Sequence, residues 1–182
     1  MEASLWTETL AGFRDQVGST DPVPAGVAIS AVTGSIALAL LAKVLRIAAK
    51  KKDVTALLDA ADAESARLAD LADRDILAFY VYMSTGNTRE AIEVPMEAAR
   101  SAVRGLALCA DAAGIVTGLT AADIGSAAAL LSGAVHAFLT SVDFNIRLMH
   151  ADEQFSASMA AERRDLELTA IRHADAVTKA HT

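Results

Sequence analysis

Aromatic side chains are scarce in this sequence, where they make up 4% of 182 residues. Proline occurs 3 times and cysteine once, as Cys109. A single cysteine excludes an internal disulfide and every multi-cysteine zinc motif. Strands favour β-branched and aromatic residues, whereas alanine, the best helix former, fills 41 positions. The composition therefore predicts an all-α fold, and 53% hydrophobic residues suffice for a buried core.

Basic residues are also few. The chain has 16 Lys and Arg against 23 Asp and Glu, a net charge of −7, and its longest basic run is 50–52. We therefore expect no nucleic-acid partner and no binding to anionic membranes. No two of the four histidines have the i, i+4 spacing of a helical metal site, so we expect no metal. The first residues carry acids before any apolar run, unlike a secretory signal, which favours a cytoplasmic protein.

Two stretches contain no charged residue, 22–42 and 124–142. The first is long enough to span a membrane. However, Gly26, Ser30 and Gly34 recur every four residues on one helix face, which makes a thin helix that other helices can approach closely. This spacing also occurs in membrane helices, but neither stretch has flanking aromatic belts. We therefore expect a long small-residue central helix in a bundle, with a membrane span as the alternative.

Apolar periodicity and turn signals divide the chain into helices. We expect one domain, 1–182, that forms a single bundle of five or six helices with short connections. Residues 84–88 read as a loop, a short helical piece precedes Pro95, and residues 150–182 read as a charged C-terminal helix. The expected helices are 4–17, 24–50, 53–83, 95–118, 120–149 and 152–181.

Two charged residues allow both a structural and a functional interpretation. Asp123 has the spacing to close a capping box with Thr120. It also suits an acid or base at the mouth of a bundle, where burial would raise its pKa. Lys50 can complement the dipole at a helix C-terminus, or it can hold an anionic substrate tail. Spacing alone leaves these alternatives open.

Four short motifs follow one another along the chain. They are PVPAGVAIS at 22–30, DILAF at 75–79, VPMEA at 94–98, and AD at 122–123 followed by SVDFN at 141–145. In this order and at these spacings the sequence resembles the cyclodeaminase/methenyltetrahydrofolate cyclohydrolase family. These are all-helical folate enzymes related to the deaminase half of formiminotransferase-cyclodeaminase. The resemblance extends over about 13–149.

The resemblance implies a homodimer whose cleft is lined by the proline turn at Pro24 and by the start of the Asp123 helix. It also implies C–N bond chemistry at an amidine-like carbon of a tetrahydrofolate derivative, with no tightly bound cofactor. In a cyclohydrolase, water adds to the methenyl bridge and the intermediate opens to a formyl product. In a cyclodeaminase, an internal amine attacks the formimino carbon and ammonia leaves.

The resemblance also assigns roles to single residues. Asp123 would move the proton and stabilise the cationic carbon, because a carboxylate suits both tasks. Asn145 would orient Asp123 or the substrate, and Phe79 would pack against a flat ring. The remaining expected substrate-binding residues are Pro24, Gly26, Ser30, Ser141 and Lys50.

The sequence departs from the family pattern at the turn and at the last motif. Ala25 and Val27 replace two glycines, and Ser141 replaces an asparagine. Glycine at these positions would let a ligand come close to the backbone, and the side chains of Ala25 and Val27 leave less room for it. Two further hypotheses follow. The chain is recruited to cyclise or open a non-folate imine or amidine in a biosynthetic pathway, or it is a catalytically silent helical dimer that binds a ligand or partner.

Overall fold

The computed structural model describes residues 4–148 and 152–180, and within these ranges every regular element is helical, as the composition predicted. The elements are the 3₁₀ helix η1 (Leu5–Thr7) and the α-helices α1 (Leu10–Val17), α2 (Gly26–Ala48), α3 (Thr55–Thr85), α4 (Arg89–Ala113), α5 (Ala121–Leu148) and α6 (Glu153–Ala180).

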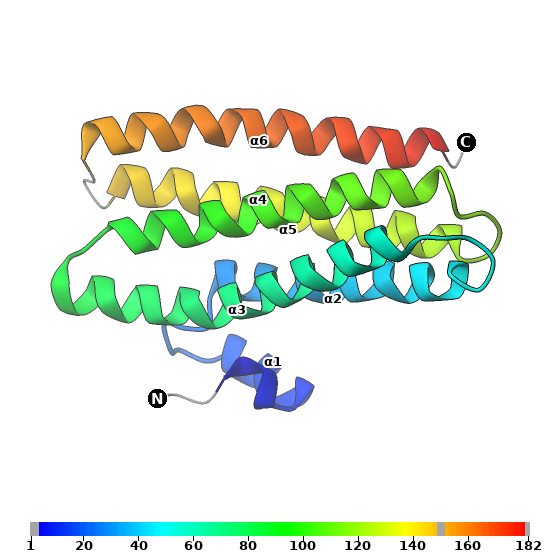
Figure 1. Cartoon of the computed structure of the whole chain (residues 1–182). Helices are drawn as coiled ribbons and strands as arrows, with labels where there is room; N and C mark the ends of the chain where they lie inside the picture. Colours follow the sequence, from blue (N-terminus) through cyan, green and yellow to red (C-terminus); the bar gives the residue numbers. More distant parts are fainter. Residues whose placement is uncertain (1–3, 149–151, 181–182) are drawn as a thin grey trace.

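The four long helices α2 to α5 form an antiparallel bundle in which α2 packs between α3 and α5 and α4 packs opposite α2 (Figure 1). The last helix, α6, lies along α4 and α5, while η1 and α1 lie on the opposite side of the molecule. Short connections force consecutive helices to run antiparallel. The expected bundle of five or six helices is therefore confirmed.

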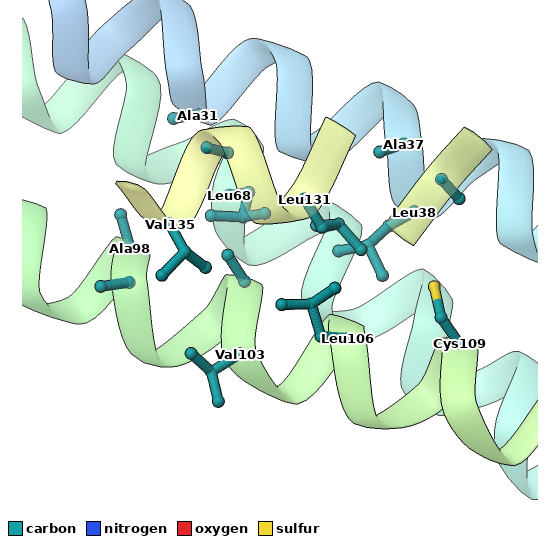
Figure 2. Packing of buried hydrophobic residues seen from close by; sticks show 14 of the residues in the cluster. Ala31, Ala37, Leu38, Leu68, Ala98, Val103, Leu106, Cys109, Leu131 and Val135 are labelled. Carbon is teal, nitrogen blue, oxygen red and sulfur yellow. The ribbon is translucent and has the colours of Figure 1, made fainter. Parts of the chain in front are cut away.

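Small residues let the helices of the bundle approach closely. At Gly34 of α2 an added Cβ would lie 2.9 Å from Leu68 Cδ1, and at Gly105 of α4 it would lie 3.0 Å from Leu38 Cδ2. Figure 2 shows Leu38, Leu68 and Leu131 filling the space over these thin helices. The core consequently depends on a few leucines set among many buried alanines.

The predicted N-terminal helix, 4–17, is wrong in one respect, because it is two pieces. The Thr9 hydroxyl accepts the Gly12 N–H at 3.0 Å and so starts α1 anew. The preceding turn, η1, is tied to α3 instead, since Asp73 accepts the Ser4 hydroxyl at 2.6 Å and the Leu5 N–H at 2.9 Å. Local capping outweighs the continuous apolar stripe here.

The boundaries of α2 and α3 shift by one or two residues from the prediction. The turn at Pro24 does not open α2 itself, because Ala25 is the N-cap residue and Gly26 begins the helix. The Asp53 carboxylate accepts the Thr55 N–H at 3.2 Å at the start of α3. That helix continues through Thr85 and ends where Gly86 adopts a φ of 70°, which favours glycine.

Pro95 does not mark the start of a helix, so this part of the prediction is wrong. It lies in the second turn of the continuous helix α4, which already begins at Arg89. Proline has no N–H, so α4 loses the hydrogen bond that residue 95 would donate to the Ala91 carbonyl. That carbonyl accepts the Asn145 side-chain amide at 2.7 Å instead.

The C-terminal helix α6 begins after Asp152, which accepts the Phe155 N–H at 2.9 Å. Arg100 of α4 pairs with Glu162 of α6, at 2.7 Å between Nη2 and Oε2. Among the apolar residues of α6, Phe155, Met159 and Leu166 pack on the core, whereas Ile171 is 53% exposed. The predicted ends at Met149 and His181 lie outside the described residues.

By length and composition alone, α2 and α5 could each cross a membrane, a test that core helices of soluble proteins also pass. Within the bundle, 56% of the most apolar window of α2 is buried, and 44% of that of α5. The inner half of each helix forms the core between the layers, as predicted for a central helix. The rest of each window lies outside this core.

Truncation of Leu68 to alanine should test how far the core depends on its few large side chains. Leu68 is fully buried and packs over Gly34. We expect Leu68→Ala to lower the free energy of unfolding by about 2–5 kcal/mol, because a cavity forms between α2 and α3. Denaturant titration followed by circular dichroism measures the loss. The neighbouring exposed Arg67→Ala should cost less than about 1 kcal/mol, and equal losses in both variants would contradict this account.

Candidate active site

A cavity of about 180 Å³ opens where α2 begins and α5 ends. Side chains from four helices and from the proline turn converge on it because the antiparallel bundle brings the start of α2, the second half of α3, the start of α4 and the end of α5 to the same end. Its lining residues are Val23, Ala25, Gly26, Val27, Asp75, Ala78, Phe79, Tyr82, Ala91, Ser141 and Asn145.

Asp75 is the acidic residue in the lining of this cavity. Its carboxyl group lies against the first turn of α2, where no side chain caps the helix. Burial penalises the charged form and raises its pKa from 3.8 to about 6, while the backbone N–H of Ala28 offsets part of this rise. A carboxyl group with this pKa can both accept and donate a proton close to neutral pH.

Two polar side chains of α5 face the cavity, one helical turn apart. Asn145 donates its amide to the Ala91 carbonyl at 2.7 Å, so its own carbonyl oxygen remains available as an acceptor. Ser141 donates to the carbonyl of Ala137 at 3.1 Å, which leaves the oxygen of its hydroxyl able to accept a hydrogen bond. Both groups can therefore bind N–H donors of a ligand.

Aromatic side chains form one wall of the cavity. Phe79 and Tyr82 follow Asp75 by four and seven residues and therefore share one face of α3. The Phe79 ring is held edge-to-face against Tyr80, with 5.6 Å between the ring centroids. Next to the Asp75 carboxyl group, these rings give a flat ligand an apolar surface.

The structure brings together four of the predicted site residues, Gly26, Phe79, Ser141 and Asn145. Two others lie beside the cavity rather than in its lining. Pro24 is buried between two lining residues, and the Ser30 hydroxyl donates to the Gly26 carbonyl at 2.7 Å.

Asp123 and Asn145, which are predicted to act together, do not meet within one chain. They lie at opposite ends of α5, and 22 residues of helix separate them by about 33 Å. Asp123 is partly exposed, and its carboxylate lies 3.8 Å from the ammonium group of Lys43. It does not close a capping box either, since its recorded contact with Thr120 is a backbone hydrogen bond of 3.2 Å.

Lys50 also lies away from the cavity. It is exposed just past the C-terminus of α2, whereas the cavity is at the N-terminus of that helix. This position fits the structural interpretation, in which a cation complements the helix dipole. Within one chain, Lys50 cannot contact a ligand of the Asp75 cavity.

Asp75 is not among the site residues predicted from the sequence, although it belongs to one of the four motifs. Asp75 is the first residue of the DILAF motif, of which only Phe79 was assigned a role. On a charged helix such as α3 an aspartate normally faces solvent. Asp75 lies against the first turn of α2 instead. Its contact there, with the backbone N–H of Ala28, joins residues that are 47 positions apart in the sequence.

A larger hollow, of about 300 Å³, lies between α5 and α6. It is mostly apolar and includes His136, Glu167 and Asp175. No residue of this hollow belongs to the motifs that mark the Asp75 cavity. In the described ranges no group of three or more His, Cys, Asp or Glu side chains is placed to hold a metal ion.

Comparison with known proteins shows the family of the chain. The family model described as formiminotransferase-cyclodeaminase matches residues 9–87 and 84–165. The chain belongs to this family. The structure is similar to that of formiminotetrahydrofolate cyclodeaminase from Thermotoga maritima, with a TM-score of 0.89, 25% identity and 96% of each chain covered. No curated protein sequence matches the chain. The formiminotransferase-cyclodeaminase family match spans every helix that lines the Asp75 cavity.

The pKa of Asp75 predicts how stability changes with pH. Because the pKa is raised in the folded state, the charged carboxylate costs stability above pH 6, and this cost disappears below about pH 4. Asp75→Asn should therefore be more stable than wild type at pH 8, by at most about 3 kcal/mol, and about equally stable near pH 4, as measured by thermal unfolding at both pH values. Asp70→Asn, on the exposed side of α3, controls for loss of a charge. An equal increase in the stability of Asp75→Asn at both pH values would contradict the raised pKa of Asp75.

Proposed function

We propose that the chain catalyses C–N bond chemistry at an amidine-like carbon of a tetrahydrofolate derivative, either cyclodeamination of a formimino group or hydrolysis of a methenyl bridge. One observation carries the proposal: a half-buried carboxyl group, Asp75, whose pKa is raised to about 6 beside an amide, a hydroxyl and two aromatic rings. Membership of the family and the similarity to a cyclodeaminase support the choice of substrate.

Asp75 is the proton-transferring group in this proposal. In cyclodeamination, an internal amine forms the new C–N bond and gives its proton to the Asp75 carboxylate. Asp75 then gives that proton to the amidine nitrogen, and ammonia leaves as the old C–N bond breaks. In methenyl hydrolysis, water forms the new C–O bond and gives one proton to the Asp75 carboxylate, which passes it to the ring nitrogen as the C–N bond breaks. The hydroxyl proton of the intermediate leaves to solvent as the formyl carbonyl forms.

The other residues of the cavity position the substrate. The Asn145 carbonyl oxygen and the Ser141 hydroxyl accept N–H groups from the substrate ring, and the Phe79 and Tyr82 rings pack against its flat face. The carbonyl of Ala91, left without a helical donor by Pro95, holds the Asn145 amide in place.

A smaller, non-folate amidine or imine is the second candidate. The side chains of Ala25 and Val27 line the cavity, whose volume is about 180 Å³. Sites for drug-sized ligands usually have about 300–1,000 Å³. Val27→Gly should therefore tighten the binding of a folate but not that of a small cyclic amidine, as measured by the shift in melting temperature that each ligand causes.

Substitution of Asp75 tests the proposed chemistry directly. With methenyl- or formimino-tetrahydrofolate as substrate, Asp75→Asn should lower kcat about 10²–10⁴-fold because an amide cannot carry the proton. The wild-type pH profile should show a limb near pH 6. Asp70→Asn should keep the wild-type kcat. If Asp75→Asn retains kcat within threefold, Asp75 is not the acid–base group.

A further inference from the structure

The contact between Asn145 and the Ala91 carbonyl depends on an irregularity in α4. In a regular α-helix each interior carbonyl accepts the N–H of the residue four positions further on. Position 95 is a proline, so the Ala91 carbonyl has no such donor, and the proline ring takes up the space where that N–H would lie. Helix α5 lies along α4 (Figure 1), and the Asn145 side-chain amide donates to this carbonyl at 2.7 Å.

The surroundings of this carbonyl make its hydrogen bond important. Ala91 is 8% exposed, and Pro95 is buried as well. A buried backbone carbonyl without a donor costs free energy, and here the Asn145 amide is the side-chain group that supplies the donor. Rotation of the amide away from Ala91 is therefore unfavourable. Pro95 thus creates the acceptor that holds Asn145 in one orientation.

The orientation of Asn145 determines which kind of ligand atom it can bind. An asparagine side chain has a donating and an accepting end, and half a turn of the amide exchanges the two. Because the nitrogen of Asn145 is bound to Ala91, the oxygen is the end that is left for a ligand. Ser141 is also left as an acceptor, since its hydroxyl donates to the Ala137 carbonyl at 3.1 Å. At both positions of α5, the cavity therefore suits N–H groups of a ligand.

We propose that Pro95 is a positioning residue that determines specificity: it leaves the Ala91 carbonyl free for the Asn145 amide, so that Asn145 only accepts hydrogen bonds from the substrate. This inference rests on the proposed function for the identity of the substrate. The cavity selects a ring that presents N–H groups to α5. A ring with a carbonyl oxygen or a lone pair at that edge is rejected, because two acceptors would then face each other without a proton.

A double-mutant cycle tests the hydrogen bond without any ligand. Asn145→Ala should lower the melting temperature by about 5 °C, because the buried Ala91 carbonyl loses its donor. Pro95→Ala supplies an N–H at position 95 that can donate to the same carbonyl. In the Pro95→Ala background, Asn145→Ala should therefore lower the melting temperature at most half as much. Equal losses in the two backgrounds would show that Pro95 does not hold Asn145, and would overturn the proposal.

Kinetics with methenyl- or formimino-tetrahydrofolate test the positioning role. Pro95→Ala keeps Asp75 but frees the Asn145 amide to rotate, so KM should rise about 5–10-fold while kcat stays within threefold. In the Asn145→Ala background the same substitution should leave KM unchanged within twofold. Gly114→Ala is the control, because Gly114 follows the last residue of α4 with a φ of −72°, which suits alanine, and it should keep the wild-type KM and kcat. A wild-type KM in Pro95→Ala, or an equal rise in both backgrounds, would overturn the positioning role.

A small probe separates this inference from the proposed function. If the wild type converts neither folate, the proposed function is wrong, and isocytosine then tests the specificity of the cavity. This ring carries an amino group and a ring N–H, so it should raise the melting temperature of the wild type more than that of Pro95→Ala. Equal shifts of the two proteins would overturn the role of Pro95, whereas a larger shift of the wild type would support it even without turnover.

Discussion

The close approach of α2 to its neighbours is the constraint on which the rest of the structure depends. With glycine at position 34, Leu68 of α3 lies almost against the backbone of α2, and Gly105 lets Leu38 and Leu131 meet α4 in the same way. A core with so few large side chains reaches normal packing density only if the helices come near one another. This approach fixes where α2 begins, and therefore where the proline turn meets α3.

The properties of Asp75 follow from that position. Burial by neighbouring helices disfavours its charge, and the backbone N–H of Ala28 partly restores it. The two effects oppose each other and leave the pKa near 6, between that of an exposed aspartate and that of a fully desolvated one. The first turn of α2 thus tunes the acid as well as bounding the cavity.

A proline produces a second link between packing and site. Pro95 interrupts the hydrogen bonding of α4 without ending the helix, because Asn145 of α5 satisfies the Ala91 carbonyl. The same amide thereby fixes the orientation of Asn145 in the cavity. A residue that weakens one helix locally therefore positions a side chain from another.

The sequence by itself determined the helical class and the order and approximate length of the long helices, because periodicity and composition are local properties. Four residues of the cavity lining were predicted through the motifs that carry the family resemblance. It did not determine that 4–17 is two pieces or that Pro95 lies within α4, since Asp73 and Asn145 provide the hydrogen bonds there from distant parts of the chain. Only the tertiary structure showed that Asp75, and not Asp123, lines the cavity of this chain. Both are aspartates on helices, but burial depends on what packs against a residue: the start of α2 lies over Asp75, whereas Asp123 lies at the far end of α5.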